Sequence, residues 1–83
     1  MFFNKKSFKV KITGRAGLIY QENGKSLEVD SEMLGGPEHD IVIYKQSIER
    51  WSDDELINDM EKEHILQNLK THFESQKYKV DIA

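Results

Sequence analysis

The three histidines, His39, His64 and His72, are the side chains in this sequence best suited to proton transfer or metal binding. Glu61 and His64 stand three residues apart, a spacing that carboxylate-bridged metal centres use on their helices. Such centres draw ligands from several helices, and this sequence predicts only one. A solvent-exposed helix face is therefore the better interpretation of the pair. His72 borders an apolar stripe and is expected to be a partly buried helix residue.

Other catalytic signatures are not recognisable in the sequence. The chain has no cysteine, which excludes a thiolate nucleophile, a cysteine metal site and a disulfide. No serine stands in a nucleophile elbow. The glycines at Gly14-x-x-Gly17 and Gly35-Gly36 lack the number and the following helix of a phosphate-binding loop. We therefore predict a protein that is not an enzyme and that holds no metal or cofactor.

The candidate partner-binding residues are Arg15, Trp51, Asp53, Asp54 and Glu55. Trp51 is interpreted first as a ring that covers the end of a small core, and second as a binding anchor, because tryptophan is enriched at interface hot spots. The acidic run after it is either a solvated helix start or a patch that meets a basic partner. Arg15, in a glycine-flanked turn, is expected to face solvent, where a fixed turn is also a platform for recognition.

Composition sets limits on the class of protein. The chain has 83 residues, 37% of them hydrophobic, and a formal net charge of −3. This length predicts one domain over residues 1–83 with a single core. The acidic balance argues against nucleic-acid binding, which needs clustered lysine and arginine. Residues 1–7 are a polar lead-in without a signal-peptide core, and no stretch has the apolar length of a membrane span. The expectation is a soluble cytoplasmic protein.

The main helix is predicted over residues 59–76. Asn58 and Glu61 have the types and spacing of a capping box at its start. One apolar stripe recurs at helical spacing, formed by Ile65, Leu66, Leu69 and Phe73.

A longer helix from residue 53 is the alternative, because Ser52 and Glu55 also fit a capping box. In such a helix Leu56, Ile57 and Met60 point away from the apolar stripe. We therefore predict a turn or a single helical turn over residues 52–57.

Five short strands are predicted around the helix. Alternating or β-branched runs place them at residues 8–13, 18–22, 25–30, 40–45 and 78–82. Asn23-Gly24 predicts a tight hairpin turn between the second and third strands. Residues 31–39 contain Gly35-Gly36-Pro37 and are predicted as a loop. The order β-β-β-β-α-β gives an α+β fold, an antiparallel meander with one helix packed on one face and the last strand at a sheet edge.

Several segments together carry a resemblance to a known family. They are Arg15-x-Gly17-Leu18-Ile19-Tyr20, Asn23-Gly24-Lys25, Asp30-Ser31-Glu32, Ile43-Tyr44, Trp51 and Glu61-x-x-x-Ile65-Leu66-x-Asn68-Leu69. Over residues 12–82 the chain resembles small α+β bacterial immunity proteins of polymorphic toxin systems, which have a characteristic tryptophan.

The resemblance implies a non-enzymatic protein that binds one cognate toxin domain and neutralises it by occlusion. It assigns no toxin-contact residues, so the candidates above rest on charge and residue type. The alternative is a small module that self-associates through an exposed sheet edge and acts as a scaffold, with homo-oligomers as its consequence.

Overall fold

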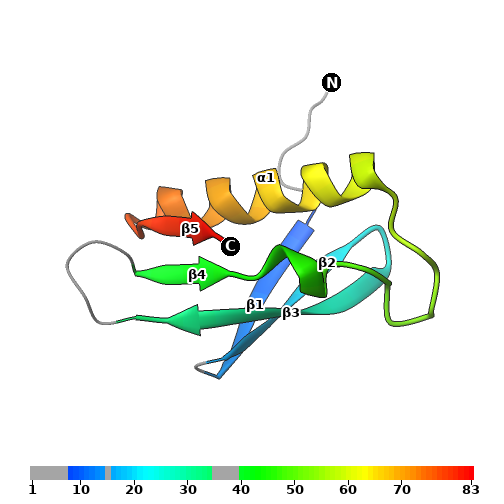
Figure 1. Ribbon diagram of the computed structural model, residues 1–83, viewed down its shortest axis with the longest axis horizontal. Coiled ribbons are helices and arrows are strands. Elements are labelled where there is room, and N and C mark those ends of the chain that lie inside the picture. The colour runs from blue at the N-terminus through cyan, green and yellow to red at the C-terminus, as the bar shows by residue number, and fades with distance from the viewer. Residues whose placement is uncertain (1–7, 15, 35–39) are drawn as a thin grey trace.

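A computed structural model of the chain describes residues 8–14, 16–34 and 40–83 and shows one helix packed against a five-stranded sheet (Figure 1). The elements are β1 (Phe8–Gly14), β2 (Gly17–Glu22), β3 (Lys25–Met33), β4 (Ile41–Ile43), the 3₁₀ turn η1 (Lys45–Ser47), α1 (Asp59–Ser75) and β5 (Val80–Ile82). The predicted α+β class and the order β-β-β-β-α-β are confirmed.

The strands lie in the sheet in chain order, β1-β2-β3-β4-β5. The first four pair antiparallel, as a meander predicts, and β5 lies at the predicted edge. The last pair differs from the prediction, because β4 and β5 run parallel. The chain crosses back through α1 between these two strands, and such a crossover returns the chain in the same direction.

The hairpin between β2 and β3 turns at Asn23 and Gly24, as predicted. Both residues have positive φ, 54° and 77°, the backbone conformation that a two-residue type I′ turn requires. Glu22 and Lys25 are cross-strand partners at its base. The turn therefore fixes the register that places Tyr20 opposite Leu27 in the core.

Strand β3 extends through Ser31 and Met33, residues that were predicted to belong to a loop. The prediction was wrong because β3 changes partners along its length. Up to Asp30 it pairs with β2, and from Ser31 it pairs with β4. Strand β4 is shorter than predicted, since the chain leaves the sheet at Tyr44 and enters η1. The predicted loop residues 35–39 lie outside the described residues, as does the lead-in 1–7.

The helix α1 begins at Asp59, as predicted, and ends at Ser75, one residue earlier than predicted. Asn58 Oδ1 accepts from the Glu61 N–H at 2.8 Å, and the Asn58 N–H donates to Glu61 Oε1 at 3.2 Å. This capping box closes the first turn. Residues 52–57 form turns rather than a continuation of the helix.

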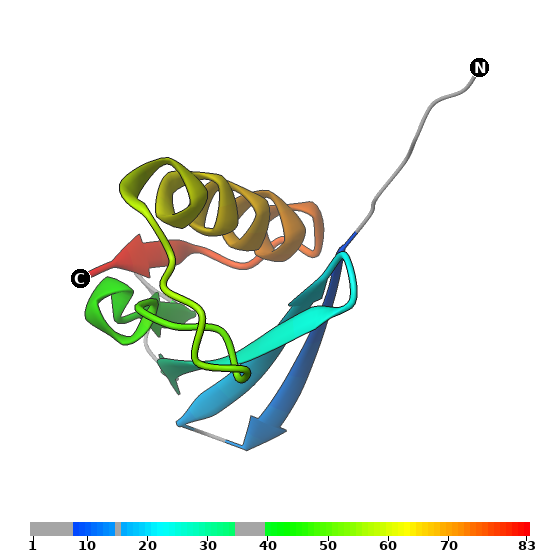
Figure 2. The same cartoon turned by 90° about the vertical axis from the view of Figure 1, so that its right-hand side faces the viewer.

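The core fills one face of the sheet under α1 (Figure 2). It contains Leu18, Tyr20, Leu27, Val29, Ile41, Ile43, Ile48, Trp51, Ile65, Leu66, Leu69 and Phe73. Phe8 and Val10 are only partly buried against it. Ile12, two residues after Val10 on the same side of β1, is 44% exposed. The closed end of the β1–β2 hairpin projects away from α1, so the helix does not cover Ile12 (Figure 2).

Candidate functional site

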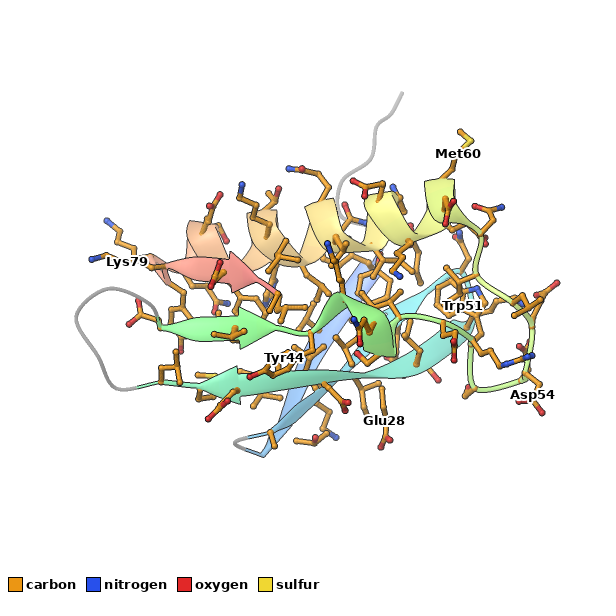
Figure 3. The ribbon with its side chains drawn as sticks, in the orientation of Figure 1. Glu28, Tyr44, Trp51, Asp54, Met60 and Lys79 are labelled. Atoms are coloured by element: carbon orange, nitrogen blue, oxygen red, sulfur yellow. The ribbon has the colours of Figure 1, made fainter. Side chains whose placement is uncertain are left out.

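Four of the predicted partner-binding residues are described by the structure, and they lie at one end of the molecule. They are Trp51, Asp53, Asp54 and Glu55. Trp51 is only 7% exposed and belongs to the core, where its ring lies 6.4 Å from that of Tyr20. Asp53 and Asp54 follow on an exposed loop at the same end, which Figure 3 marks with Trp51 and Asp54. Arg15 lies outside the described residues. We call residues 49–57 the Trp51 loop.

Backbone hydrogen bonds shape the Trp51 loop into a small hairpin. Arg50 and Leu56 form an isolated antiparallel bridge. The Trp51 N–H donates to the Glu55 carbonyl at 2.9 Å, and the Asp54 N–H donates to the Trp51 carbonyl at 2.9 Å. Asp54 adopts a φ of 71°, a left-handed conformation that Asp tolerates better than most residues. The buried indole and the tight turn together hold the acidic tip in a fixed position.

Lys25 connects this loop to the β2–β3 hairpin. Its Nζ lies 3.2 Å from Asp53 Oδ2 and also forms an ion pair with Glu55. The same ammonium lies 6.0 Å from the centroid of the Trp51 ring. The Ser52 N–H donates to the Ser26 carbonyl at 2.8 Å and adds a backbone link to β3. Two of the three carboxylates of the acidic run are thus paired within the chain, and Asp54 is exposed and forms no ion pair with a described residue.

A cleft of about 220 Å³ separates the loop from the start of α1. Its lining consists of Glu22, Asn23, Lys25, Trp51, Glu61, His64 and Ile65. The sequence analysis missed Glu22 as a member of this group. The available signal was its position two residues after Tyr20, which places both side chains on the core-facing side of β2.

A polar network crosses from β2 to α1 beside the cleft. Tyr20 OH donates to Glu22 Oε1 at 2.6 Å, and Asn68 Nδ2 donates to Tyr20 OH at 2.8 Å. His64 Nε2 lies 2.8 Å from Glu22 Oε2, where its N–H donates to the carboxylate. Burial, followed by the hydrogen bond to Glu22, raises the pKa of Tyr20 well above its usual range. The phenol therefore stays protonated and links the strand to the helix.

The side chains of this network are hydrogen-bonded to one another. The Glu61 carboxylate caps the helix by accepting from the Asn58 N–H, and the His64 ring is hydrogen-bonded to Glu22. Within residues 8–14, 16–34 and 40–83, no group of three or more His, Cys, Asp or Glu side chains is placed to hold a metal ion. His72 is partly buried between the rings of Phe8 and Phe73, as predicted. His39 lies outside the described residues.

Two solvent-exposed apolar side chains accompany the acidic tip. Leu56 is 63% exposed and Met60, in the first turn of α1, is 83% exposed. Neither belongs to the buried core. Exposed apolar groups beside charged ones are a common composition of protein-binding surfaces. In the part of the chain that the structure describes, no helix is both long and apolar enough to cross a membrane.

The fold and this end of the molecule define a small α+β domain whose distinctive surface groups suit contact with another protein. A family model described as Immunity protein 74 matches residues 9–83. The chain therefore belongs to the Immunity protein 74 family, a small immunity protein family of toxin systems. No match was found among curated proteins or among solved structures.

Proposed function

We propose that this protein is a non-enzymatic immunity protein that binds one cognate toxin in the cytoplasm and neutralises it by covering its active surface. The observation that carries the proposal is the family match over residues 9–83. The described residues add support to the non-enzymatic part of the proposal. Tyr20, Glu22 and His64 form a network of polar side chains that hydrogen-bond to one another. Occlusion needs only a complementary surface, and we propose that the Trp51 loop supplies it.

The proposed contact is the acidic tip of the Trp51 loop, Asp53, Asp54 and Glu55, with the exposed Leu56 next to it in the chain. A toxin that cuts nucleic acid presents a cationic cleft, and an acidic inhibitor is steered toward it and competes with the phosphate backbone. Trp51 supports this tip from below. Because it is 7% exposed, its effect on binding is expected through the position of the loop more than through direct contact.

Self-association through a sheet edge is the second candidate function. The edge strand β1 carries Lys9 and Lys11, both exposed. Lysines on an edge strand oppose pairing with another strand, because two copies bring like charges together. This arrangement favours the toxin-binding proposal over a scaffold assembled through β1.

The test is binding to the toxin domain encoded beside the gene for this protein, together with rescue of cells that express that toxin. We expect a stable complex, and we expect Asp53→Lys with Asp54→Lys to slow association and to weaken its dependence on salt. Glu63→Lys with Glu74→Lys is the matched control, since it changes the net charge equally on the exposed side of α1. Absence of binding and of rescue by the wild-type protein would refute the proposed function. Equal association rates for the two double variants at low salt would refute the Trp51 loop as the contact.

A further inference from the structure

The face of the sheet opposite α1 is uncovered and holds a second, wider groove. Strand alternation places Glu28, Asp30 and Glu32 of β3 on this face, because the residues between them point into the core. The groove has a volume of about 700 Å³ and is lined by Ala16, Asp30, Ser31, Glu32, Met33 and Tyr44. Figure 3 shows Tyr44 between β3 and β4, far from Trp51 and Asp54. The groove is therefore a surface separate from the Trp51 loop.

The groove is acidic, and its charges are not neutralised within the described chain. Asp30 and Glu32 are both exposed, and neither forms an ion pair with any described residue. The nearest lysine on this face of the neighbouring strands is Lys11, which stands opposite Ile19, and Ile19 in turn stands opposite Glu28. The backbone of Lys11 thus lies two strand spacings, about 10 Å, from that of Glu28, and Glu28 is closer to Lys11 than Asp30 and Glu32 are. None of the ion pairs among the described residues involves Lys11.

An aromatic ring is fixed beside these carboxylates. Tyr44 OH donates to Glu32 Oε1 at 2.9 Å, and the side chain is 38% exposed. This hydrogen bond is the main reason that the pKa of Tyr44 is raised, so the phenol stays protonated and the ring keeps its place. Among the described residues, no donor contacts the second carboxylate oxygen of Glu32 or either carboxylate oxygen of Asp30. Ala16 adds apolar surface to the groove.

These groups together match the side chain of an arginine. A guanidinium donates in parallel to carboxylate oxygens and stacks on an aromatic face, whereas its aliphatic stem prefers apolar contacts. We propose that the groove receives an arginine of the toxin, with Asp30 and Glu32 binding the guanidinium, Tyr44 stacking on it and Ala16 contacting the stem. This inference rests on the proposed function and adds a second contact surface to it.

The first experiment compares variants in binding to the toxin domain of the adjacent gene. Asp30→Asn with Glu32→Gln removes both charges and preserves the acceptor for Tyr44. Loss of charge-assisted hydrogen bonds is expected to weaken the affinity by about 10- to 100-fold. Glu28→Gln is the matched control, because it lies on the same face of the same strand but outside the groove lining. We expect it to change the affinity by less than about threefold.

A second experiment tests the groove without the toxin. The peptide acetyl-Gly-Arg-Gly-amide is titrated into the wild-type protein, and the backbone amide signals of Ala16, Met33 and Tyr44 are followed by NMR. A citrulline peptide, which keeps the shape and removes the charge, is the control. We expect shifts at these amides with arginine only, smaller shifts with a lysine peptide, and none in the Asp30→Asn, Glu32→Gln protein.

The two experiments separate the two proposals. If the toxin binds, and the double variant binds it as tightly as Glu28→Gln does, the groove proposal is overturned and the proposed function stands. If the toxin does not bind the wild-type protein, the function falls and the peptide titration decides the groove. Arginine-specific shifts would then support it, and equal responses to arginine and citrulline would overturn it.

Discussion

The two acidic surfaces of this protein differ in how their charges are balanced. At the Trp51 loop, Asp53 and Glu55 share Lys25 as a partner from the β2–β3 hairpin. In the groove on the open sheet face, Asp30 and Glu32 have no ion-pair partner among the described residues. A cationic partner must compete with Lys25 for Asp53 and Glu55, whereas no described residue competes through an ion pair for Asp30 and Glu32. The pair Asp53 and Glu55 and the pair Asp30 and Glu32 therefore differ in how available their charges are for binding, although each pair contributes two carboxylates.

The aromatic residue of each surface shows the same contrast. Trp51 is 7% exposed and holds the loop in place from inside the core, whereas Tyr44 is 38% exposed and lies within the groove. The loop is a rigid projection that depends on its buried ring, and the groove is a surface whose ring is available to a ligand. Each prediction below breaks or sharpens this comparison, and the largest expected effect comes first.

Replacing Phe73 with alanine should destabilise both surfaces together, because the residue belongs to neither. Its side chain is 0% exposed and its ring centroid lies 5.7 Å from that of Tyr78. The loss of a fully buried phenylalanine is expected to cost about 3–5 kcal/mol of unfolding free energy. Chemical denaturation measures the change. An unchanged unfolding midpoint would mean that the helix register is wrong, and that the comparison rests on an incorrect core.

Replacing the aromatic residue of each surface should separate them. Trp51→Ala removes a buried ring and is expected to cost about 3–5 kcal/mol, slightly less than Phe73→Ala because the ring is not fully enclosed. Tyr44→Ala removes an exposed ring and should cost less than about 1 kcal/mol. Thermal and denaturant unfolding of the two variants give the comparison. Equal stability losses would show that the loop and the groove do not differ in their dependence on the core.

Much of the fold could be predicted because its signals are local. Asn23 and Gly24 fix a turn through their own backbone preferences, and Asn58 with Glu61 closes a cap within one helical turn. The extension of β3 through Ser31 and Met33 could not be read locally. It depends on a second partner, β4, which pairs there only after a separate loop has brought it alongside.

The surfaces were harder to predict than the fold. The acidic run after Trp51 was recognised as a candidate because its charges are consecutive, but Lys25 is distant in sequence and its pairing with that run was not anticipated. The groove was not found at all. Asp30 belongs to β3 and Tyr44 follows β4, and their contact with one cavity depends on how the β3–β4 pair lies in the folded sheet.

High pH should distinguish the tyrosines of the two regions. The pKa of Tyr20 is raised mainly by burial, and the pKa of Tyr44 mainly by its hydrogen bond to Glu32. A raised folded-state pKa means that the folded protein binds the proton more tightly than the unfolded chain. The stability contribution is thus complete below pH 10 and is lost as the pH rises above it.

Tyr20→Phe should therefore reduce stability near neutral pH by about 1–3 kcal/mol, since Glu22 and Asn68 lose a partner. It should also make the remaining stability less sensitive to pH between 10 and 12 than the wild type. Tyr44→Phe should leave the alkaline transition almost unchanged, because the exposed phenol contributes little to stability. Melting temperatures over this pH range test both variants. If the stability of Tyr20→Phe fell above pH 10 as steeply as that of the wild type, Tyr20 would not be the group responsible for the pH dependence.

The smallest effect on stability is expected from the change that makes the two acidic surfaces alike. Lys25→Met removes the ammonium that pairs with Asp53 and Glu55 and keeps a stem of similar length beside Trp51. Exposed ion pairs contribute about 0–1 kcal/mol, so the unfolding free energy should change little. The freed carboxylates should attract a cationic toxin more strongly and raise the association rate at low salt, by about two- to threefold.

Lys9→Met, on the edge strand β1, makes the same change in net charge without releasing a pair. Stopped-flow binding to the toxin domain at low and high salt compares the two variants. A faster rate for Lys25→Met alone, lost in high salt, would place the loop at the interface, and equal rates would leave the groove as the acidic surface that the toxin meets.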